Sequence, residues 1–122
     1  MLRKFIRSFY AKPEKVKPQI CITEEGLQVV CGKEAIGLIF WSEITQIIAY
    51  KYDNFSYDEI CVGFVPKNKS DPWLEISEEW EGFLRAKEKM EEMFPSINKE
   101  WLGEIMVPAF ERKETVLYEF SS

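Results

Sequence analysis

The feature that most constrains this chain is its most apolar stretch, residues 35–53, AIGLIFWSEITQIIAYKYD. Strand-favouring residues dominate it on both sides of the tetrapeptide Trp41–Ile44, where two polar residues interrupt the apolar run. One of them, Ser42, is a residue type that caps helical turns. The stretch therefore predicts a strand over 35–41, a tight corner, and a second strand over 45–52. Because strands that are apolar on both faces lie inside sheets, we expect this pair at the centre of the core.

Shorter strand-like segments lie on both sides of this centre and are separated by clusters of turn-forming residues. Gly26 and Gly32 each lie in such a cluster, and glycine readily adopts the positive φ that tight turns often need. The two-residue period of apolar side chains is typical of an antiparallel meander. The expected strands cover residues 19–23, 27–31, 59–65 and 72–76, with a last strand or extended tail over 115–120.

The strongest helical periodicity follows these strands. Ser77 is a favourable N-cap, and the acidic residues after it would complement the positive end of a helix dipole. We expect an amphipathic helix from near Ser77 to about Phe94, with one face on the sheet. Asn98 can cap a second, shorter helix over 99–106. The apolar face of the first helix is expected to comprise Trp80, Phe83, Ala86, Met90 and Met93.

These elements predict an α+β protein. We expect a curved antiparallel sheet or partly open barrel of about six or seven strands, closed by the late amphipathic helix and extended by the short one. With 122 residues, the chain suits one compact domain. We assign that domain to residues 19–122 and treat residues 1–18 as a basic N-terminal segment and linker.

The residue inventory argues against several kinds of active site. The chain has no histidine, which is the commonest general base and a common transition-metal ligand. Cys21, Cys31 and Cys61 lack the close spacing of zinc or redox motifs, so we expect buried, reduced thiols that act as small hydrophobes in apolar strands. No glycine-rich phosphate loop and no G-x-S-x-G occur. We therefore expect no catalytic residues, no metal site and no cofactor, and we expect a cytoplasmic setting because the cysteine count is odd without a secretion signal.

Two sets of charged residues allow both a functional and a structural interpretation. The acidic group could bind a basic partner or a cation, but it lacks the spacing of a calcium loop, so we expect a solvated helix face. Lys51 could be a desolvated amine, but we expect its stem to pack on the sheet and its ammonium group to reach solvent. The acidic group comprises Glu78, Glu79, Glu81, Glu91 and Glu92.

Charge is distributed unevenly along the chain. Residues 1–19 carry six basic residues and one acidic residue, whereas residues 20–122 carry ten basic and twenty acidic residues, giving a net charge of -5. The acidic body disfavours nucleic acid as a partner. Leu2, Phe5, Ile6 and Phe9 follow helical spacing, so residues 1–10 could anchor the protein to an anionic membrane surface. Alternatively, this segment packs on its own domain or on a second copy, or is a frayed terminus. The candidate membrane-contact residues are Arg3, Lys4, Phe5, Arg7 and Phe9.

The segment between the fourth and fifth expected strands combines aromatic and acidic side chains. Aromatic side chains often dominate the energetics of protein contacts, so this loop is a candidate partner-binding surface. The alternative is that its aromatic rings fold back onto the sheet. The candidate partner-binding residues are Asp53, Phe55, Tyr57 and Asp58.

The order of a meander, a W-x-E-I corner at Trp41–Ile44, further strands and a late helix resembles pleckstrin-homology-like domains, which are found in many small bacterial proteins. This resemblance covers roughly residues 19–120. Four short sequence runs, listed at the end of this paragraph, also resemble one family of small uncharacterised bacterial proteins with such a domain. It implies the fold but no set of catalytic residues. Phosphoinositide-binding members look basic at their first strand turns, whereas this chain has Glu24, Glu25 and Glu34 there. The runs are Ala49–Asp53, Gly82-Phe83, Pro108–Glu111 and Val116–Tyr118.

We derive three functional hypotheses from these features. The first is a non-catalytic protein-interaction module, one form of which neutralises a basic protein partner such as a toxin. The second is a peripheral membrane module anchored by the basic N-terminus. The third and weakest is an enzyme that uses carboxylates alone. A homodimer through the second helix or an exposed sheet edge is compatible with each of them.

Overall fold

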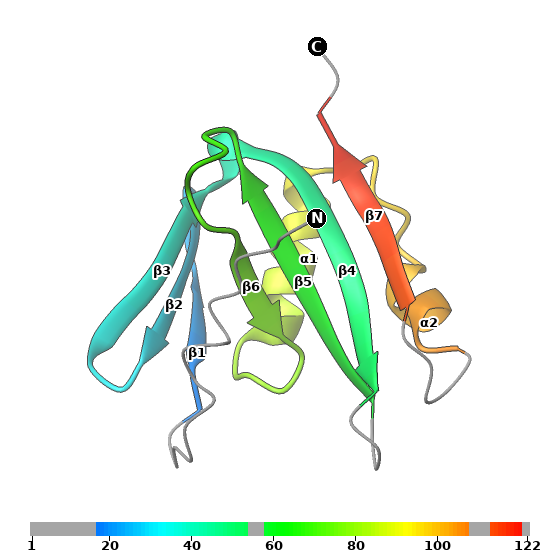
Figure 1. Cartoon of the computed structure of the whole chain (residues 1–122), viewed down its shortest axis with the longest axis horizontal. Helices are drawn as coiled ribbons and strands as arrows, with labels where there is room; N and C mark the ends of the chain where they lie inside the picture. The colour runs from blue at the N-terminus through cyan, green and yellow to red at the C-terminus, as the bar shows by residue number, and fades with distance from the viewer. Residues whose placement is uncertain (1–16, 54–57, 108–112, 121–122) are drawn as a thin grey trace.

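The computed structural model describes residues 17–53, 58–107 and 113–120, which form seven β-strands, one short 3₁₀ turn and two α-helices (Figure 1). The α+β class and the order of elements predicted from the sequence are confirmed. The strands are β1 (Gln19–Ile22), β2 (Gly26–Cys31), β3 (Glu34–Phe40), β4 (Ile44–Asp53), β5 (Asp58–Pro66), β6 (Leu74–Ser77) and β7 (Lys113–Glu119). The helices are α1 (Phe83–Met93) and α2 (Trp101–Ile105), and the 3₁₀ turn is Trp41–Glu43.

The strands form two antiparallel sheets. The first has the order β1-β2-β3 and the second the order β6-β5-β4-β7. β4 pairs with β5 along its whole length, from Ile44 opposite Pro66 to Asp53 opposite Asp58. β7 returns from the end of the chain to pair with the other edge of β4. Among the described residues the two sheets exchange no strand pairing and do not close into a barrel, and Figure 1 shows α1 behind β5 and β4.

The corner between the sheets lies where the sequence predicts it. β3 ends at Phe40, the 3₁₀ turn follows, and β4 begins at Ile44. The Trp41 side chain is 4% exposed, and its ring lies edge-on to Phe64 and Phe94 with centroids 6.5 Å and 6.2 Å away. Its indole N–H donates to the Thr23 carbonyl at 3.2 Å, which ties the corner to the β1–β2 turn. Ser42 does not act as the expected cap, because the turn has no side-chain capping bond.

The main helix packs its apolar face on the core as expected, with two corrections. Phe83, Ala86 and Met90 are buried, whereas Met93 is 38% exposed and lies off that face. The helix begins at Phe83, six residues after the expected cap, because Ser77 is the last residue of β6. The Ser77 hydroxyl instead accepts from the Glu79 backbone N–H at 3.1 Å, in the turn that leaves the strand.

Gly82 sets the point at which the helix begins. It is the N-cap with φ of +96°, a conformation that side-chain-bearing residues rarely adopt. A Cβ at this position would also lie 2.5 Å from the Ile20 carbonyl oxygen. The glycine therefore allows the chain to turn sharply into α1 while it passes directly against β1.

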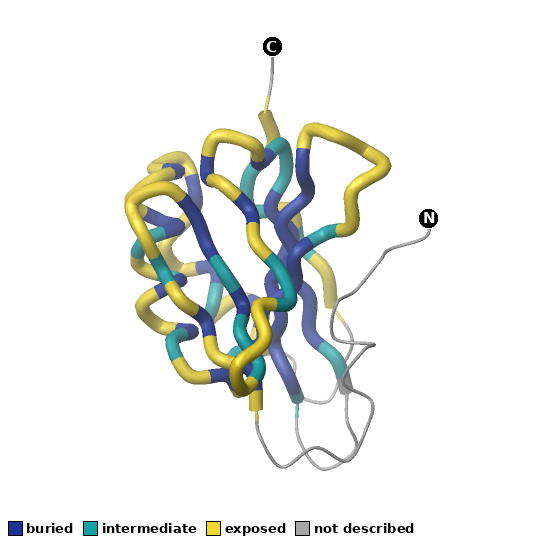
Figure 2. The backbone as a smooth tube through the Cα atoms, turned by 90° about the vertical axis from the view of Figure 1, so that its left-hand side faces the viewer, coloured by how far each residue is buried: buried dark blue, intermediate teal, exposed yellow. Residues whose placement is uncertain are grey.

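In the second sheet, β4, β5 and β6 carry buried residues on both faces, whereas β7 has none, and Figure 2 shows the buried residues as dark-blue stretches of the backbone. On the inner face, Ile47, Val62 and Phe64 pack with α1 and the first sheet in the main core. On the outer face, Ile48, Tyr50, Cys61 and Val65 form a second, smaller apolar cluster. Burial of both faces explains why β4 reads as continuously apolar. The expectation that the strand over 35–41 also lies at the centre of the core is wrong, because β3 is the edge strand of the first sheet and most of its residues are not buried.

Two lysines hold the carboxyl end of α2. Lys51 and Lys113 are register partners on β4 and β7. The Lys51 ammonium donates to the Met106 carbonyl at 3.1 Å, and the Lys113 ammonium donates to the Glu104 and Val107 carbonyls at 2.9 and 3.0 Å. Cations at a helix C-terminus satisfy carbonyls that have no partner in the helix. The expectation that the Lys51 ammonium reaches solvent is wrong, because the side chain is fully buried.

Candidate functional site

A groove lined by described residues lies where the two sheets come together beside the start of α1. It has a volume of about 630 Å³ and is open to solvent. Its walls come from the amino-terminal end of β1, the β2–β3 turn and the connection between β6 and α1. We call it the acidic groove and define it by its lining residues, Lys17, Pro18, Gln19, Gly32, Glu79, Trp80 and Glu81.

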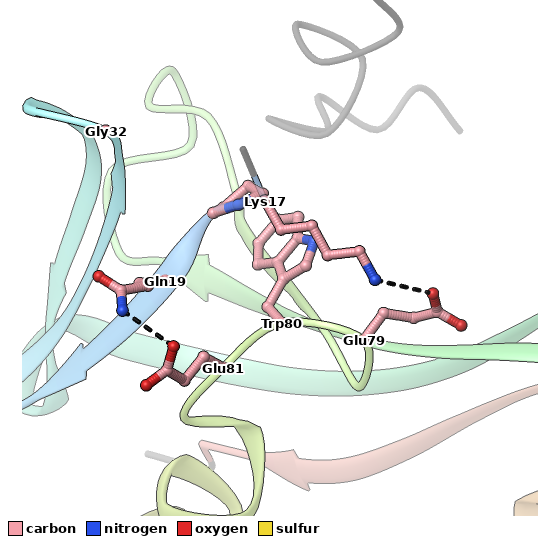
Figure 3. A pocket seen from close by; sticks show the side chains of 7 residues that line it. Lys17, Gln19, Gly32, Glu79, Trp80 and Glu81 are labelled. Carbon is pink, nitrogen blue, oxygen red and sulfur yellow. Dashed lines mark hydrogen bonds and ion pairs between the residues drawn. The ribbon is translucent and has the colours of Figure 1, made fainter. Parts of the chain in front are cut away.

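The polar groups of the acidic groove form two pairs around one aromatic ring (Figure 3). The Glu79 carboxylate lies 3.8 Å from the Lys17 ammonium, and the Glu81 carboxylate accepts from the Gln19 amide at 3.0 Å. The indole of Trp80 lies between these pairs and is 9% exposed. Two carboxylates beside an indole form a surface that suits a cationic side chain, by ion pairing and by contact with the ring.

Backbone pairing fixes this arrangement. Gln19 and Glu81 form an isolated parallel bridge, and the Ile20 N–H donates to the Glu81 carbonyl at 2.9 Å. The connection from β6 to α1 is therefore joined to β1 at Glu81, and Gly82 follows directly before the helix begins. The turn before Glu81 is closed by the Trp80 N–H, which donates to the Ser77 carbonyl at 3.1 Å. Backbone hydrogen bonds therefore hold Trp80 and Glu81 in place.

The acidic group predicted as a solvated helix face has a different structure. Glu78, Glu79 and Glu81 precede α1, so they do not lie on the helix. Glu91 lies on the helix but is buried, and its carboxylate accepts from the Trp101 indole N–H at 3.0 Å. The bond from Trp101 links α1 to α2, and the Glu91 carboxylate also pairs with the Lys87 ammonium of the same helix at 2.8 Å. The helix placement is therefore wrong for Glu78, Glu79 and Glu81, of which Glu79 and Glu81 are exposed as expected, and the solvated environment is wrong for Glu91.

Glu78 lies next to the acidic groove and is partly desolvated. Its carboxylate accepts from the Ile60 backbone N–H at 2.9 Å. Burial raises the pKa of Glu78 above its usual 4.5, and the charges of Glu79, Glu59 and Asp58 raise it further, against the opposing effect of the Ile60 bond. The ionised carboxylate is therefore less favoured here in the folded chain than in the unfolded chain.

Replacing Glu78 with glutamine should stabilise the protein at neutral pH and change it little in acid. Because the folded pKa lies above the unfolded value, the native chain loses stability as pH rises from 4.5 through the folded pKa. Glutamine keeps an acceptor for the Ile60 N–H but never ionises. Melting temperatures should therefore diverge, with the E78Q protein above the native one at about pH 7 and close to it at about pH 4. An equal shift in melting temperature at both pH values would contradict this prediction. The matched control is E88Q, which removes a carboxylate from the exposed side of α1.

Of the candidate partner-binding residues, only Asp58 has a described side chain. Its carboxylate is 17% exposed and lies 3.8 Å from the buried Lys51 ammonium, so it faces the sheet. Asp53 is described as the last residue of β4, without its side chain. Phe55 and Tyr57 lie outside the described residues, as do the candidate membrane-contact residues Arg3, Lys4, Phe5, Arg7 and Phe9.

Sequence reasoning missed the acidic groove because three separate segments form it. Trp80 was expected on the helix face, and the two carboxylates were expected to complement the helix dipole. The signal that could have revealed the groove is Gly82, since a glycine after Glu-Trp-Glu argues against a helix that runs through all four residues. The pairing with β1 is a long-range contact that the local pattern does not contain.

A smaller groove of about 310 Å³ lies between α2 and β7, lined in part by Trp101, Glu104 and Val116. β7 is the edge strand of the second sheet, and its register shifts opposite Ile47 and Ile48. A shifted register and charged residues are features that discourage strand addition at an edge. This groove is therefore a weaker candidate for a binding site.

The described residues provide neither a metal cluster nor a membrane-spanning helix. Within the ranges 17–53, 58–107 and 113–120, no cluster of three or more cysteines or carboxylates is placed to hold a metal ion. In the same ranges, neither helix has the length and apolar character required to cross a bilayer. None of the three cysteines, all of which lie in these ranges, forms a disulfide. Cys61 is buried as expected, whereas the expectation of burial is wrong for Cys21, which is exposed at the edge of the first sheet, and for Cys31, which is half-buried at the end of β2.

Comparisons with known proteins add no relative: no family model matches the chain, and neither the curated proteins nor the solved structures contain a match.

Proposed function

We propose that this protein is a non-catalytic protein-interaction module that binds a basic segment of a protein partner in the acidic groove. The observation that carries the proposal is the pair of carboxylates, Glu79 and Glu81, held on either side of the Trp80 indole. A partner's arginine or lysine side chain could pair with a carboxylate while its stem contacts the ring. Neutralisation of a basic partner is the form of this function that the groove supports best.

The charge of the domain supports the same type of partner. The described residues carry ten basic and nineteen acidic side chains. A surface of this balance attracts cationic partners over several ångströms and accelerates their association, with an effect that salt weakens. It also repels anionic lipid and nucleic acid, which makes a basic protein segment the favoured ligand.

The present partners of the two carboxylates can be exchanged at low cost. The Lys17 side chain is 68% exposed, and the bond from Gln19 to Glu81 lies at the surface. Exposed ion pairs contribute only about 0–1 kcal/mol. A partner that brings an arginine can therefore displace either contact, and arginine can bind a carboxylate with two parallel hydrogen bonds.

The proposal includes a pleckstrin-homology-like fold and a reducing, cytoplasmic setting. The two antiparallel sheets joined by the Trp41 corner, with α1 across them, support the fold. The three cysteines without a disulfide support the setting. Pleckstrin-homology-like folds host many tasks, so the function is argued from the groove and not from the fold.

Binding of a short peptide of alternating arginine and alanine tests the proposed function. Calorimetric titration at low salt should show binding to the native protein. The double variant E79Q/E81Q should bind about tenfold more weakly, because two charge pairs are lost. The matched control is E88Q/E119Q, which removes the same charge from exposed positions that do not line the groove. Equal weakening of peptide binding in both variants would show that the acidic groove is not the binding site. If the native protein did not bind the peptide, the proposed function would be contradicted.

A further inference from the structure

The outer face of the first sheet carries no charged residue. Leu27, Val29 and Ile39 point into the main core, so the residues that alternate with them along the strands lie on the outer face. In Figure 1 this sheet forms the left side of the molecule, and no described helix or strand lies beyond it. We call this surface the uncharged face and define it by its residues, Cys21, Gly26, Gln28, Val30, Ala35, Leu38 and Phe40.

Several apolar side chains of the uncharged face are open to solvent. Leu38 is 57% exposed, Phe40 is 41% exposed, and Cys21 is exposed as well. Antiparallel sheets that face water on one side commonly carry polar residues on that side. Here Gln28 is the one polar residue of the face, in a chain of which 30% of the residues are charged. Exposed apolar side chains without charge are typical of the centre of a protein interface.

The pairing register arranges the uncharged face in rows that run across the strands. Gln28 pairs with Cys21 on one side and with Leu38 on the other, so these three residues form the central row. Two sheets that pack face to face lie about 10 Å apart. A twofold axis between two such sheets, running along the central row, would place each of the three residues opposite its own counterpart. The two Gln28 amides could then hydrogen-bond to each other, since each amide both donates and accepts.

The two rows beside the central one make the face complementary to itself. Toward the corner between the sheets, Phe40 pairs with Gly26, and toward the β2–β3 turn, Ala35 pairs with Val30. Rotation about the central row brings the first of these rows over the second row of the other copy. Phe40 then lies over Ala35, and Val30 lies over Gly26. Each large side chain therefore meets a small one, as close packing requires.

We propose that the uncharged face binds a second copy of this chain, giving a symmetric dimer in which the two β1-β2-β3 sheets pack face to face. The charge of the protein supports this occupant. The described residues carry ten basic and nineteen acidic side chains, so two copies repel each other over most of their surfaces and can approach where charge is absent. The twofold rotation also places the two β1–β2 turns, each with Glu24 and Glu25, at opposite ends of the interface. Repulsion between these acidic turns is thereby avoided.

Sedimentation velocity of the full chain, from about 1 μM to about 1 mM, tests the proposal. The native protein should change from monomer to dimer over this range. The L38K variant should self-associate at least about tenfold more weakly, because two lysines would face each other at the centre of the interface. The matched control is L84K, which changes another exposed leucine, 66% exposed on α1, and should self-associate as the native protein does.

Two sedimentation results would overturn the proposal. One is a native protein that stays monomeric over the whole range, which would leave the face to a different occupant. The other is an L38K protein that self-associates no more weakly than L84K. The proposed function is tested separately by peptide binding, because none of the residues of the uncharged face lines the acidic groove.

Cross-linking at Cys21 keeps the test decisive if the L38K protein does not fold. In a C31S background, a short bismaleimide should join Cys21 of one copy to Cys21 of the other, because the central row places them opposite each other. Cys61 is 0% exposed and should not react. The matched control C21S/C31S/L84C carries its reactive thiol on α1 and should remain monomeric. Absence of the Cys21 dimer, or an equal yield of dimer from the control, would overturn the proposal.

Discussion

Replacing Trp41 with alanine should lower the free energy of unfolding by about 4 kcal/mol, within the range for loss of a large buried aromatic side chain. Trp41 is 4% exposed and contacts Phe64 on β5 and Phe94 beyond α1. Alanine would leave a cavity where the two sheets and the helix meet, and the Thr23 carbonyl would lose its indole donor. Denaturant unfolding followed by far-ultraviolet circular dichroism measures the change.

Phenylalanine at position 41 is the matched control for the indole hydrogen bond. It keeps an aromatic ring at the corner but cannot donate to Thr23. A loss of about 1–2 kcal/mol is expected for W41F, since one hydrogen bond and part of the ring are lost. If W41A cost less than W41F, or if both were within error of the native protein, the corner would not be the packing centre described here.

Replacing Lys51 with methionine should lower the free energy of unfolding by about 3 kcal/mol. The Lys51 side chain is fully buried, lies 3.8 Å from the Asp58 carboxylate, and donates to the Met106 carbonyl at 3.1 Å. Methionine fills similar volume but leaves a mostly buried carboxylate without this cation. Removal of one partner of a buried pair is costly because the other charge remains desolvated.

The Asp58 carboxylate provides the control for this pair. Asparagine at position 58 removes the charge that K51M leaves behind, so the double variant K51M/D58N should be more stable than K51M alone. A double-mutant cycle measured by denaturant unfolding isolates the coupling between the two residues. Strict additivity of the two changes would show that Lys51 acts only through the Met106 carbonyl.

Local sequence patterns were sufficient to predict the central part of the fold. The polar interruption at Ser42-Glu43 within an apolar run correctly placed the corner, and the flanking strands follow from β-branched and aromatic residues. The periodic residues Phe83, Ala86 and Met90 correctly predicted the buried face of α1. These elements were predictable because each depends on residues close together in the chain.

Long-range contacts account for what the patterns did not predict. A helix start near Ser77 was expected from capping preference, but residues 78–80 form a turn and Glu81 pairs with β1 before Gly82 leads the chain into the helix. Lys51 is buried because α2 supplies carbonyl acceptors from a distant segment. Glu91 is buried for the same kind of reason, since Trp101 donates to it.

The acidic groove belongs to the same class of feature. Its carboxylates were visible as acidic residues, but their position beside Trp80 depends on three segments that meet only in the folded chain. The informative observation is Trp80, whose surroundings differ from those that its local pattern predicts.

The most direct test of the proposed function is a nuclear magnetic resonance titration of the isotope-enriched full chain with the arginine–alanine peptide. The account predicts chemical-shift changes at the Gln19, Gly32 and Glu81 amides and at the Trp80 indole N–H, with the E79Q/E81Q variant largely unresponsive. Changes that spread over the acidic surface without favouring these groups, or that persist in E79Q/E81Q, would contradict binding in the acidic groove.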